Sequence, residues 1–202
     1  MLEPNAYRKL RRGPAVITPK DAGIIASFTG LGCGDNVIEV GGGSVFLTVF
    51  LANIVGEGGK VYSYERRPEF AEIIRKNLVK TSFESRVELI EKDAFLGVEQ
   101  KNVDLFVLDL ADAEKLLPNA LGALKEGGFA VGFLPNVEQV KDFVFTGEEI
   151  GFVHRQTVEV AVRELLVRKD RGVRPQTKGL MHTAYLSFLQ KERVAFLAEK
   201  RA

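Results

Sequence analysis

The 202-residue chain contains 46% hydrophobic and 27% charged residues and has a net charge of +1, which neither requires nor excludes a nucleic-acid partner. One cysteine excludes an internal disulfide, and with only two histidines it also excludes a zinc site rich in cysteine or histidine. No apolar run reaches the ~18 residues of a membrane span, and residues 1–13 lack the apolar core of a secretory signal. We therefore expect a cytoplasmic protein without a metal or membrane partner, with a basic N-terminal segment at 1–15, one domain at 16–191 and a tail at 192–202.

Short apolar blocks alternate along the chain with longer segments of helical period, which predicts strands and helices in turn. The strands are expected at Asn36–Val40, Val61–Tyr64, Arg86–Glu91, Asp104–Leu108 and Gly128–Leu134. The helices are expected at Pro19–Leu31, Ser44–Val55, Pro68–Val79, Ala113–Leu124 and Val137–Thr146. Several strands are apolar throughout, which is typical of a parallel sheet covered by helices on both faces.

The alternation ends after Gly151, where two segments of strand character follow each other without a helix. We expect these segments, Phe152–Arg168 and Met181–Lys191, to form an antiparallel pair at one edge of the sheet. The loop between them contains Arg171, Gly172, Arg174, Pro175 and Lys178. The sequence thus predicts an α/β fold with a doubly wound, Rossmann-like, mostly parallel sheet and a C-terminal antiparallel β-hairpin, the outline of the class I methyltransferases.

A glycine-rich loop follows the first predicted strand, and a predicted helix begins directly after it. In an open α/β sheet, ligands bind at the carboxyl ends of the strands, and glycine lets the backbone approach a ligand closely. The candidate cofactor-binding residues here are Glu39, Val40, Gly41, Gly42, Gly43 and Ser44. The alternative is a tight strand-to-helix turn that binds nothing.

Acidic residues end the next two strands. Glu65 lies 22 residues after Gly43, where a carboxylate can accept both hydroxyls of a ribose, and Asp93 is placed to meet an adenine amino group. Either acid alone is more often a solvated loop acid, but the combination with the glycine loop at successive strand ends favours an adenosyl cofactor. A dinucleotide would require a third glycine where Phe46 stands, so a cofactor without a pyrophosphate fits better.

From Arg11 to Lys191 the sequence resembles the T-loop adenine-N1 methyltransferases of tRNA, especially the archaeal and bacterial single-gene type. The segments that carry the resemblance are Arg12–Asp21, Gly34–Asp35, Tyr62–Pro68, Leu108–Leu110, Leu124–Phe129, Pro135–Val140, Arg174–Pro175 and Met181–Tyr185. The most specific of them are the Pro-Lys-Asp sequence that ends at Asp21 and the His-Thr pair at 182–183.

The resemblance implies S-adenosylmethionine as the cofactor and tRNA as the partner. It places Gly41 and Gly43 beside the methionine part, Glu65 at the ribose, and Asp93 with Ala94 at the adenine. Asp109, after the fourth strand, would face the target base beside the reactive methyl group and act as the catalytic residue. The family forms tetramers, so we expect a homo-oligomer, either a dimer or a tetramer.

The sequence also departs from the family pattern. Val45 stands where the glycine loop usually closes with another glycine, and Thr18 stands where an aromatic residue or histidine usually precedes Pro-Lys-Asp. Ala111–Glu114 replaces the proline and the acidic-Pro-Trp stretch that usually follow Asp109. The family's N-terminal β-rich domain, which helps to hold tRNA, has no counterpart in these residues. These departures affect the prediction of tRNA specificity more than the prediction of cofactor binding.

Asp109 suits methylation of adenine N1, which has a free lone pair and becomes cationic on methylation, so that a nearby carboxylate stabilises the developing charge. Capping of the following helix is the alternative role for this acid.

Two basic clusters could contact RNA phosphates, or could be ordinary solvated charge. Their candidate residues are Arg11, Arg12, Arg171, Arg174 and Lys178. A small-molecule methyltransferase of the precorrin type and a non-catalytic RNA-binding subunit remain as alternative functions.

Overall fold

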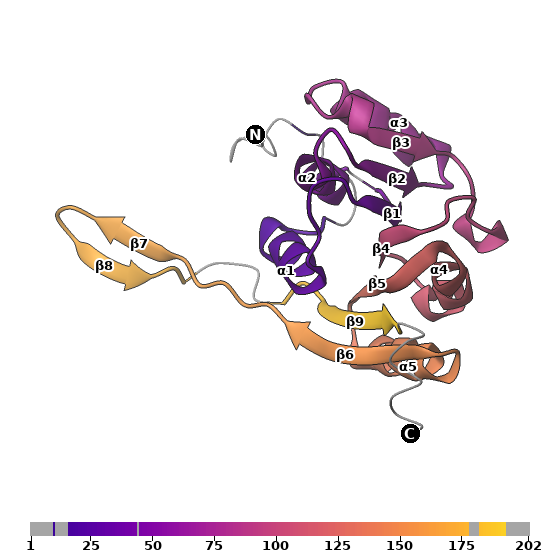
Figure 1. Ribbon diagram of the computed structural model, residues 1–202. Helices are drawn as coiled ribbons and strands as arrows, with labels where there is room; N and C mark the ends of the chain where they lie inside the picture. The colour runs from indigo at the N-terminus through magenta and orange to yellow at the C-terminus, as the bar shows by residue number, and fades with distance from the viewer. Residues whose placement is uncertain (1–9, 11–15, 44, 178–181, 193–202) are drawn as a thin grey trace.

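The computed structural model describes Leu10 and residues 16–43, 45–177 and 182–192, and it contains one large and one small sheet (Figure 1). The strands are β1 (Asn36–Val40), β2 (Lys60–Tyr64), β3 (Val87–Ile90), β4 (Val103–Leu108), β5 (Leu124–Leu134), β6 (Phe152–Glu159), β7 (Leu165–Arg168), β8 (Gly172–Pro175) and β9 (Tyr185–Lys191). The large sheet has the order β3-β2-β1-β4-β5-β9-β6, and β7 pairs with β8 alone. The strands from β1 to β5 are parallel, whereas β9 is antiparallel to both β5 and β6.

Helices cover both faces of the large sheet. The α-helices are α1 (Pro19–Thr29), α2 (Phe46–Val55), α3 (Pro68–Leu78), α4 (Leu117–Ala123) and α5 (Val137–Glu149), and three short 3₁₀ helices are η2 (Glu84–Arg86), η3 (Ala94–Leu96) and η4 (Ala113–Leu116). Buried residues of α1, α2 and α3 pack with one face of the sheet, and those of α4 and α5 pack with the other. Neighbouring strand residues such as Leu105 and Phe106 belong to the two different cores, which explains why the strands are apolar throughout.

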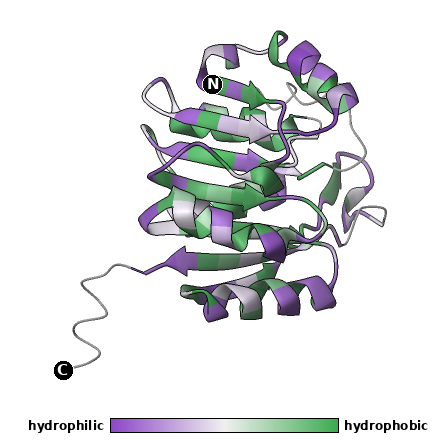
Figure 2. Ribbon diagram, turned by 90° about the vertical axis from the view of Figure 1, so that its right-hand side faces the viewer, coloured by the Kyte–Doolittle hydropathy of each residue, from purple (hydrophilic) through white to green (hydrophobic). Residues whose placement is uncertain are grey.

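The predicted doubly wound α/β fold is confirmed. β1 lies between β2 and β4, so the strand order reverses there, and the two halves of the sheet diverge at the carboxyl end of β1. Figure 2 shows hydrophobic residues concentrated along the strands of the large sheet and hydrophilic residues on the outer sides of the helices. No helix among the described residues is long and apolar enough to cross a membrane.

Several predicted elements have other bounds in the structure, and β9 begins at Tyr185 where a strand was expected from Met181. The predicted helix Ala113–Leu124 consists of the 3₁₀ helix η4 followed by the short helix α4. It ends before Leu124, because this residue already belongs to β5 and pairs with Val103 of β4. The register between β4 and β5 shifts directly after this pair. The predicted strand Phe152–Arg168 ends at Glu159, because the partner strand β9 begins opposite this residue, at Tyr185. The chain therefore leaves the sheet at residue 160.

The predicted loop after Arg168 contains β8 and forms a second hairpin with β7, which extends away from the body of the protein (Figure 1). Within this β7–β8 hairpin, Leu165 pairs with Pro175 and Val167 with Val173, so these four residues share one face. Leu165, Val167 and Val173 are 57%, 76% and 62% exposed. An isolated two-stranded hairpin with an exposed apolar face gains little stability from its own chain.

Candidate functional site

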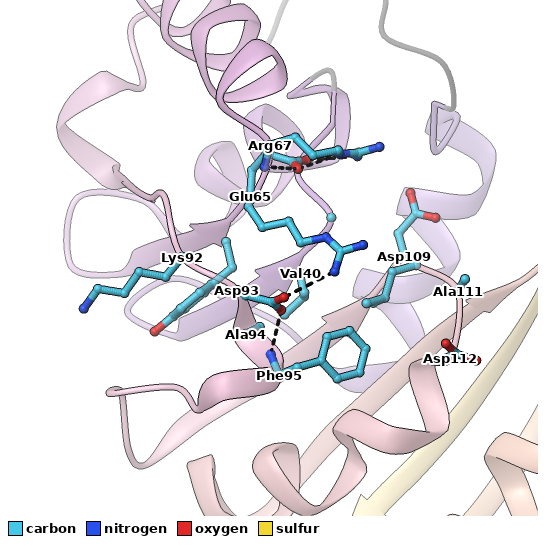
Figure 3. A pocket seen from close by; sticks show the side chains of 14 residues that line it. Val40, Glu65, Arg67, Lys92, Asp93, Ala94, Phe95, Asp109, Ala111 and Asp112 are labelled. Atoms are coloured by element: carbon cyan, nitrogen blue, oxygen red, sulfur yellow. Dashed lines mark hydrogen bonds and ion pairs between the residues drawn. The ribbon is translucent and has the colours of Figure 1, made fainter.

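A cavity of about 400 Å³ opens at the carboxyl ends of β1, β2 and β4 and over the loop that follows β3 (Figure 3). This is the place where the strand order reverses, which is the usual ligand position in a doubly wound sheet. Six predicted cofactor residues line it, namely Val40, Gly41, Glu65, Asp93, Ala94 and Asp109. The remaining lining residues are ones that the sequence analysis did not assign: Tyr64, Arg66, Arg67, Lys92, Phe95, Leu110, Ala111 and Asp112.

Gly41 allows the ends of β1 and β4 to approach each other closely. Its φ is +94°, and a Cβ built on it would lie 2.2 Å from the carbonyl oxygen of Asp109. The backbone N–H of Asp109 donates to the carbonyl of Val40 at 3.0 Å, and this hydrogen bond also holds the ends of β1 and β4 together. Glycine at position 41 therefore sets where the chain leaves β4, and with it the position of the Asp109 side chain.

Gly42 and Gly43 of the glycine loop lie behind the residues that line the cavity. Gly42 does not line the cavity, and a Cβ on it would lie 2.3 Å from the hydroxyl oxygen of Ser63. Gly43 donates its backbone N–H to Glu65 at 3.3 Å, and Ser44 lies outside the described residues. Val45, which replaces the usual closing glycine, is fully buried and has a φ of 73°, a conformation that is strained for a β-branched residue.

Glu39 lies beneath the glycine loop and does not line the cavity. Its side chain is buried and accepts hydrogen bonds from the hydroxyls of Thr48 at 2.6 Å and Ser63 at 3.0 Å. Burial raises the pKa of Glu39 to about 7, against the opposing effect of these two donors. Through Ser63, which contacts Gly42, this carboxyl group links β1, β2 and α2 under the loop. The structure thus places Glu39 as a support for the loop.

Glu65, at the end of β2, is buried and already has four donors. The guanidinium of Arg67 donates from Nε to Oε1 at 2.9 Å and from Nη2 to Oε2 at 3.3 Å. The backbone N–H groups of Arg67 and Gly43 donate to the same carboxylate at 3.1 and 3.3 Å. The Arg67 side chain also lies over the ring of Phe70, 4.0 Å from its centroid. The arginine therefore crosses the mouth of the predicted ribose site.

Asp93 follows β3 and points into the cavity from the side opposite Asp109 (Figure 3). One carboxylate oxygen accepts the backbone N–H of Phe95 at 3.0 Å, which caps η3, and the other pairs with Arg66 at 3.2 Å. Ala94 is buried beside it, and Tyr64 and Phe95 contribute aromatic rings to the wall. A flat adenine would meet apolar and aromatic surface here as well as a hydrogen-bond acceptor.

Asp109 is half-buried in the cavity wall, and burial raises the pKa of its carboxyl group to about 7. The neighbouring Glu39 raises this pKa further, whereas Arg67 lowers it. Asp109 is not the cap of the following helix, because η4 begins after Asp112. A partly ionised carboxyl group at the strand-reversal point is therefore directed at the ligand space, which is unusual for a purely structural acid.

Two segments far apart in the sequence meet beside this edge of the sheet. Lys20 donates to Asp21 and to Thr183, both at 2.7 Å, and Thr18 donates to Asp21 at 2.8 Å. His182, the neighbour of Thr183, contacts Glu159 and the carbonyl of Pro135. The Pro-Lys-Asp and His-Thr pieces of the sequence thus join the start of α1 to the start of β9. They lie next to the end of β5, one strand away from Asp109.

Two of the predicted RNA-binding residues, Arg171 and Arg174, lie in the described part of the chain, and neither lines the cavity. Arg171 and Arg174 are exposed on the β7–β8 hairpin, which extends away from the sheet (Figure 1). Arg11, Arg12 and Lys178 lie outside the described residues. Arg66 and Arg67, which the sequence analysis did not assign, are the arginines that line the cavity. Their position directly after Glu65, at the end of a predicted strand, is the signal that could have identified them.

The groups around the cavity fit S-adenosylmethionine better than a phosphate-bearing cofactor. Four carboxylates line the space, those of Glu65, Asp93, Asp109 and Asp112. Carboxylates accept hydrogen bonds from hydroxyl and amino groups and attract a sulfonium cation. A pyrophosphate is disfavoured because Phe46 stands where the dinucleotide fingerprint has its third glycine. Gly41 lines the same space, and its missing Cβ allows the end of β4 with Asp109 to lie directly against the end of β1. In the described part of the chain, no group of three or more His, Cys, Asp or Glu side chains could hold a metal ion.

Comparison with known proteins gives relatives over nearly the whole chain. A tRNA (adenine(57)-N(1)/adenine(58)-N(1))-methyltransferase TrmI from Methanocaldococcus jannaschii is 35% identical over 93% of this chain and 76% of its own length. A crystal structure of tRNA (m1A58) methyltransferase TrmI from Aquifex aeolicus superposes with a TM-score of 0.85 at 27% identity, covering 94% of this chain and 76% of that one. A SAM-dependent O-methyltransferase from Thermotoga maritima gives a TM-score of 0.86 at 31% identity, with 94% and 70% coverage.

The family comparison agrees with these relatives. Residues 11–178 match the family described as "tRNA methyltransferase complex GCD14 subunit", which includes β1 to β8 and therefore the whole cavity. The predicted resemblance to tRNA methyltransferases is confirmed. The chain belongs to the GCD14 family of tRNA methyltransferase subunits and is a class I methyltransferase with S-adenosylmethionine as its cofactor.

Proposed function

We propose that this protein transfers a methyl group from S-adenosylmethionine to N1 of an adenine in tRNA. The observation that carries the proposal is the position of Asp109, whose carboxyl group lies at the end of β4 in the same cavity as Glu65 and Asp93. The family match and the names of two relatives, both tRNA adenine-N1 methyltransferases, support the same substrate.

The residues around the cavity have separate roles in holding the cofactor. Glu65 accepts the ribose hydroxyls, Asp93 and Ala94 meet the adenine, and Gly41 lies beside the methionine part. The cofactor supplies an already activated methyl group, so the protein's main task is to align donor and acceptor. We assign the binding of the cofactor to these residues and the support of the loop to Glu39.

Asp109 is the proposed catalytic residue. Adenine N1 attacks with its own lone pair and needs no base, but the product carries a positive charge on the ring. A carboxylate fixed beside the base stabilises this charge as it develops and can accept a hydrogen bond from the exocyclic amine. The hydrogen bond from the backbone N–H of Asp109 to the carbonyl of Val40, at 3.0 Å, holds the backbone of this residue in place before the reaction.

The substrate is tested by mass spectrometry of nucleosides from tRNA of a strain that lacks the gene. We expect 1-methyladenosine to be lost, to return with the wild-type gene and to stay absent with Asp109→Asn. Unchanged 1-methyladenosine, together with loss of a methylated tetrapyrrole, would favour the small-molecule alternative. Restoration by Asp109→Asn to the wild-type level would favour a non-catalytic subunit.

The rate of methyl transfer should depend on pH through Asp109. Because burial raises the pKa of this acid to about 7, it is mostly protonated below that pH, and the neutral form cannot stabilise a cation. We expect kcat/KM for the cofactor to rise about tenfold per pH unit up to pH 7 and to level off above it. Glu39 titrates in the same range, so the control is Asp109→Asn. A rise that persists in this variant would assign the pH dependence to Glu39.

We also propose that the β7–β8 hairpin contacts the RNA backbone. Its exposed cations include Arg168, Arg171 and Arg174, and Arg168 and Arg174 lie on the face opposite Leu165, Val167 and Val173. Replacing all three with Gln should lower the slope of log K for tRNA against log salt by about 2–3, since each phosphate contact contributes about 0.7–0.9. The matched control replaces three exposed lysines of the body, Lys76, Lys80 and Lys115. Equal slopes in both variants would leave the hairpin charges without a role in RNA binding.

The apolar face of the β7–β8 hairpin supports a homo-oligomer. Leu165, Val167 and Val173 are largely exposed, and a second copy of the chain would cover them and stabilise the hairpin. We propose a dimer or a tetramer on this basis, and light scattering of the pure protein measures which of them forms. The cytoplasmic location stays a prediction.

A further inference from the structure

Two arginines form ion pairs with the carboxylates that are proposed to bind the cofactor, Arg67 with Glu65 and Arg66 with Asp93. Glu65 accepts two hydrogen bonds on each oxygen, from Gly43 and from the backbone and side chain of Arg67. A carboxylate offers about four acceptor positions, so the ribose hydroxyls can bind only if one of these donors leaves. The two backbone donors are fixed by the glycine loop and by the start of α3. The guanidinium of Arg67, with a side chain that is 46% exposed, is the donor that can move.

The same competition exists on the other side of the cavity. One oxygen of Asp93 is held by the backbone N–H of Phe95, and the other is paired with Arg66 at 3.2 Å (Figure 3). An adenine amino group would need the oxygen that Arg66 occupies. The Arg66 side chain is 63% exposed, and ion pairs of this exposure are weak, so that a ligand can displace them.

Displacement changes which charged groups at the cavity mouth are paired. In the structure each arginine is paired with one acid, Arg67 with Glu65 and Arg66 with Asp93. Once neutral hydroxyl and amino groups take over the two carboxylates, both guanidinium groups lose their partners while their backbones stay at the rim. Arg67 remains held near the mouth by its stacking on Phe70, 4.0 Å from the ring centroid. The rim then presents two cations beside Asp109, in the place where an RNA strand must approach to bring a base to the methyl group.

We propose that the cofactor displaces Arg67 from Glu65 and Arg66 from Asp93, and that the released guanidinium groups bind phosphates of the RNA next to the target base. Cofactor binding and RNA binding thereby support each other. Arginine suits this exchange, because its planar donor fork matches a carboxylate and a phosphate equally well. The inference rests on the proposed RNA substrate for its second half, and on the cavity alone for its first.

The first half is tested by calorimetry with S-adenosylhomocysteine in the absence of RNA. Arg67→Gln removes the competitor for Glu65, so the ligand should bind about threefold to fivefold more tightly than to the wild type. An analogue of the ligand without the two ribose hydroxyls should show no such gain. The matched control is Arg75→Gln on α3, whose side chain is 49% exposed, is also paired with carboxylates and lies outside the cavity wall. Equal or weaker binding to Arg67→Gln would overturn the displacement.

The second half is tested by titrating tRNA with and without saturating S-adenosylhomocysteine. We expect the ligand to raise the affinity of the wild type for tRNA about tenfold, and tRNA to raise the affinity for the ligand by the same factor. In the double variant Arg66→Gln/Arg67→Gln this factor should fall close to one, whereas in Arg75→Gln it should stay. A wild-type affinity for tRNA that is independent of the ligand would overturn the link. Failure of the proposed function would show differently, as intact binding in both experiments without methyl transfer.

Discussion

Asp109→Asn is expected to lower the rate of methyl transfer by about 10²–10³, which is the usual loss when one preorganised electrostatic contact to a transition state is removed. The backbone of residue 109 is fixed by its hydrogen bond to Val40 and by the close contact with Gly41, so Asn should occupy the same position. Asn keeps the size and one acceptor oxygen but lacks the negative charge. The change therefore removes stabilisation of the cationic product without removing the fold.

The measurement is transfer of labelled methyl groups to tRNA from a strain that lacks the gene, combined with calorimetry of cofactor binding. Binding should change little, because Glu65 and Asp93 supply the proposed contacts to the ribose and the adenine. The matched control is Asp112→Asn, which changes another carboxylate of the cavity wall that is 60% exposed and paired with Lys115. Equal activity of Asp109→Asn and the wild type would remove Asp109 from the reaction.

Gly41→Ala should lower methyl transfer about 100-fold through the position of Asp109. The added Cβ would lie 2.2 Å from the Asp109 carbonyl oxygen, far inside contact distance, so the ends of β1 and β4 must separate by about 1 Å. A displacement of this size at a reacting group costs about 10² in rate. The variant also places alanine at a φ of +94°, which costs about 1–3 kcal/mol of folding stability.

Gly34→Ala separates the two effects. Gly34 has a φ of +91°, but a Cβ on it would have no heavy atom within 4 Å, and it does not line the cavity. This control should lose a similar amount of stability in thermal unfolding and keep its rate of methyl transfer. If both variants lost activity in proportion to stability, the close contact between Gly41 and Asp109 would have no special role in the reaction.

The sequence by itself determined the fold class and the location of the site. Strands that are apolar throughout, alternating with helical segments, have few solutions other than a parallel sheet with two covered faces. Glycines and acids at successive strand ends must then meet at one edge, as Gly41, Glu65, Asp93 and Asp109 do. Local chemistry and sequence order suffice for this, because the carboxyl ends of parallel strands share an edge.

The late segments were harder to predict from sequence. The sequence Phe152–Arg168 contains no turn residue at Glu159 that would predict the end of a strand. The strand ends there because β9, its partner, begins opposite this residue. The sequence does not predict the second hairpin: β7 falls at the end of the long predicted strand and β8 in the loop after it, because their alternating apolar residues have no core to pack against. Strand ends of this kind depend on pairing between distant segments.

Only the tertiary structure determined which acids face the cavity and which support the loop. In sequence, Glu39 and Glu65 both look like cofactor ligands, but Glu39 points away from the cavity to Thr48 and Ser63, while Glu65 faces it. The raised pKa of Asp109 depends on burial and on Glu39, seventy positions earlier in the chain. The pairing of Arg66 and Arg67 with two different acids likewise depends on the distance between β2 and the loop after β3. Residue type and spacing predict which groups gather at an edge, but side-chain direction, burial and ion pairing are set by packing across the whole sheet.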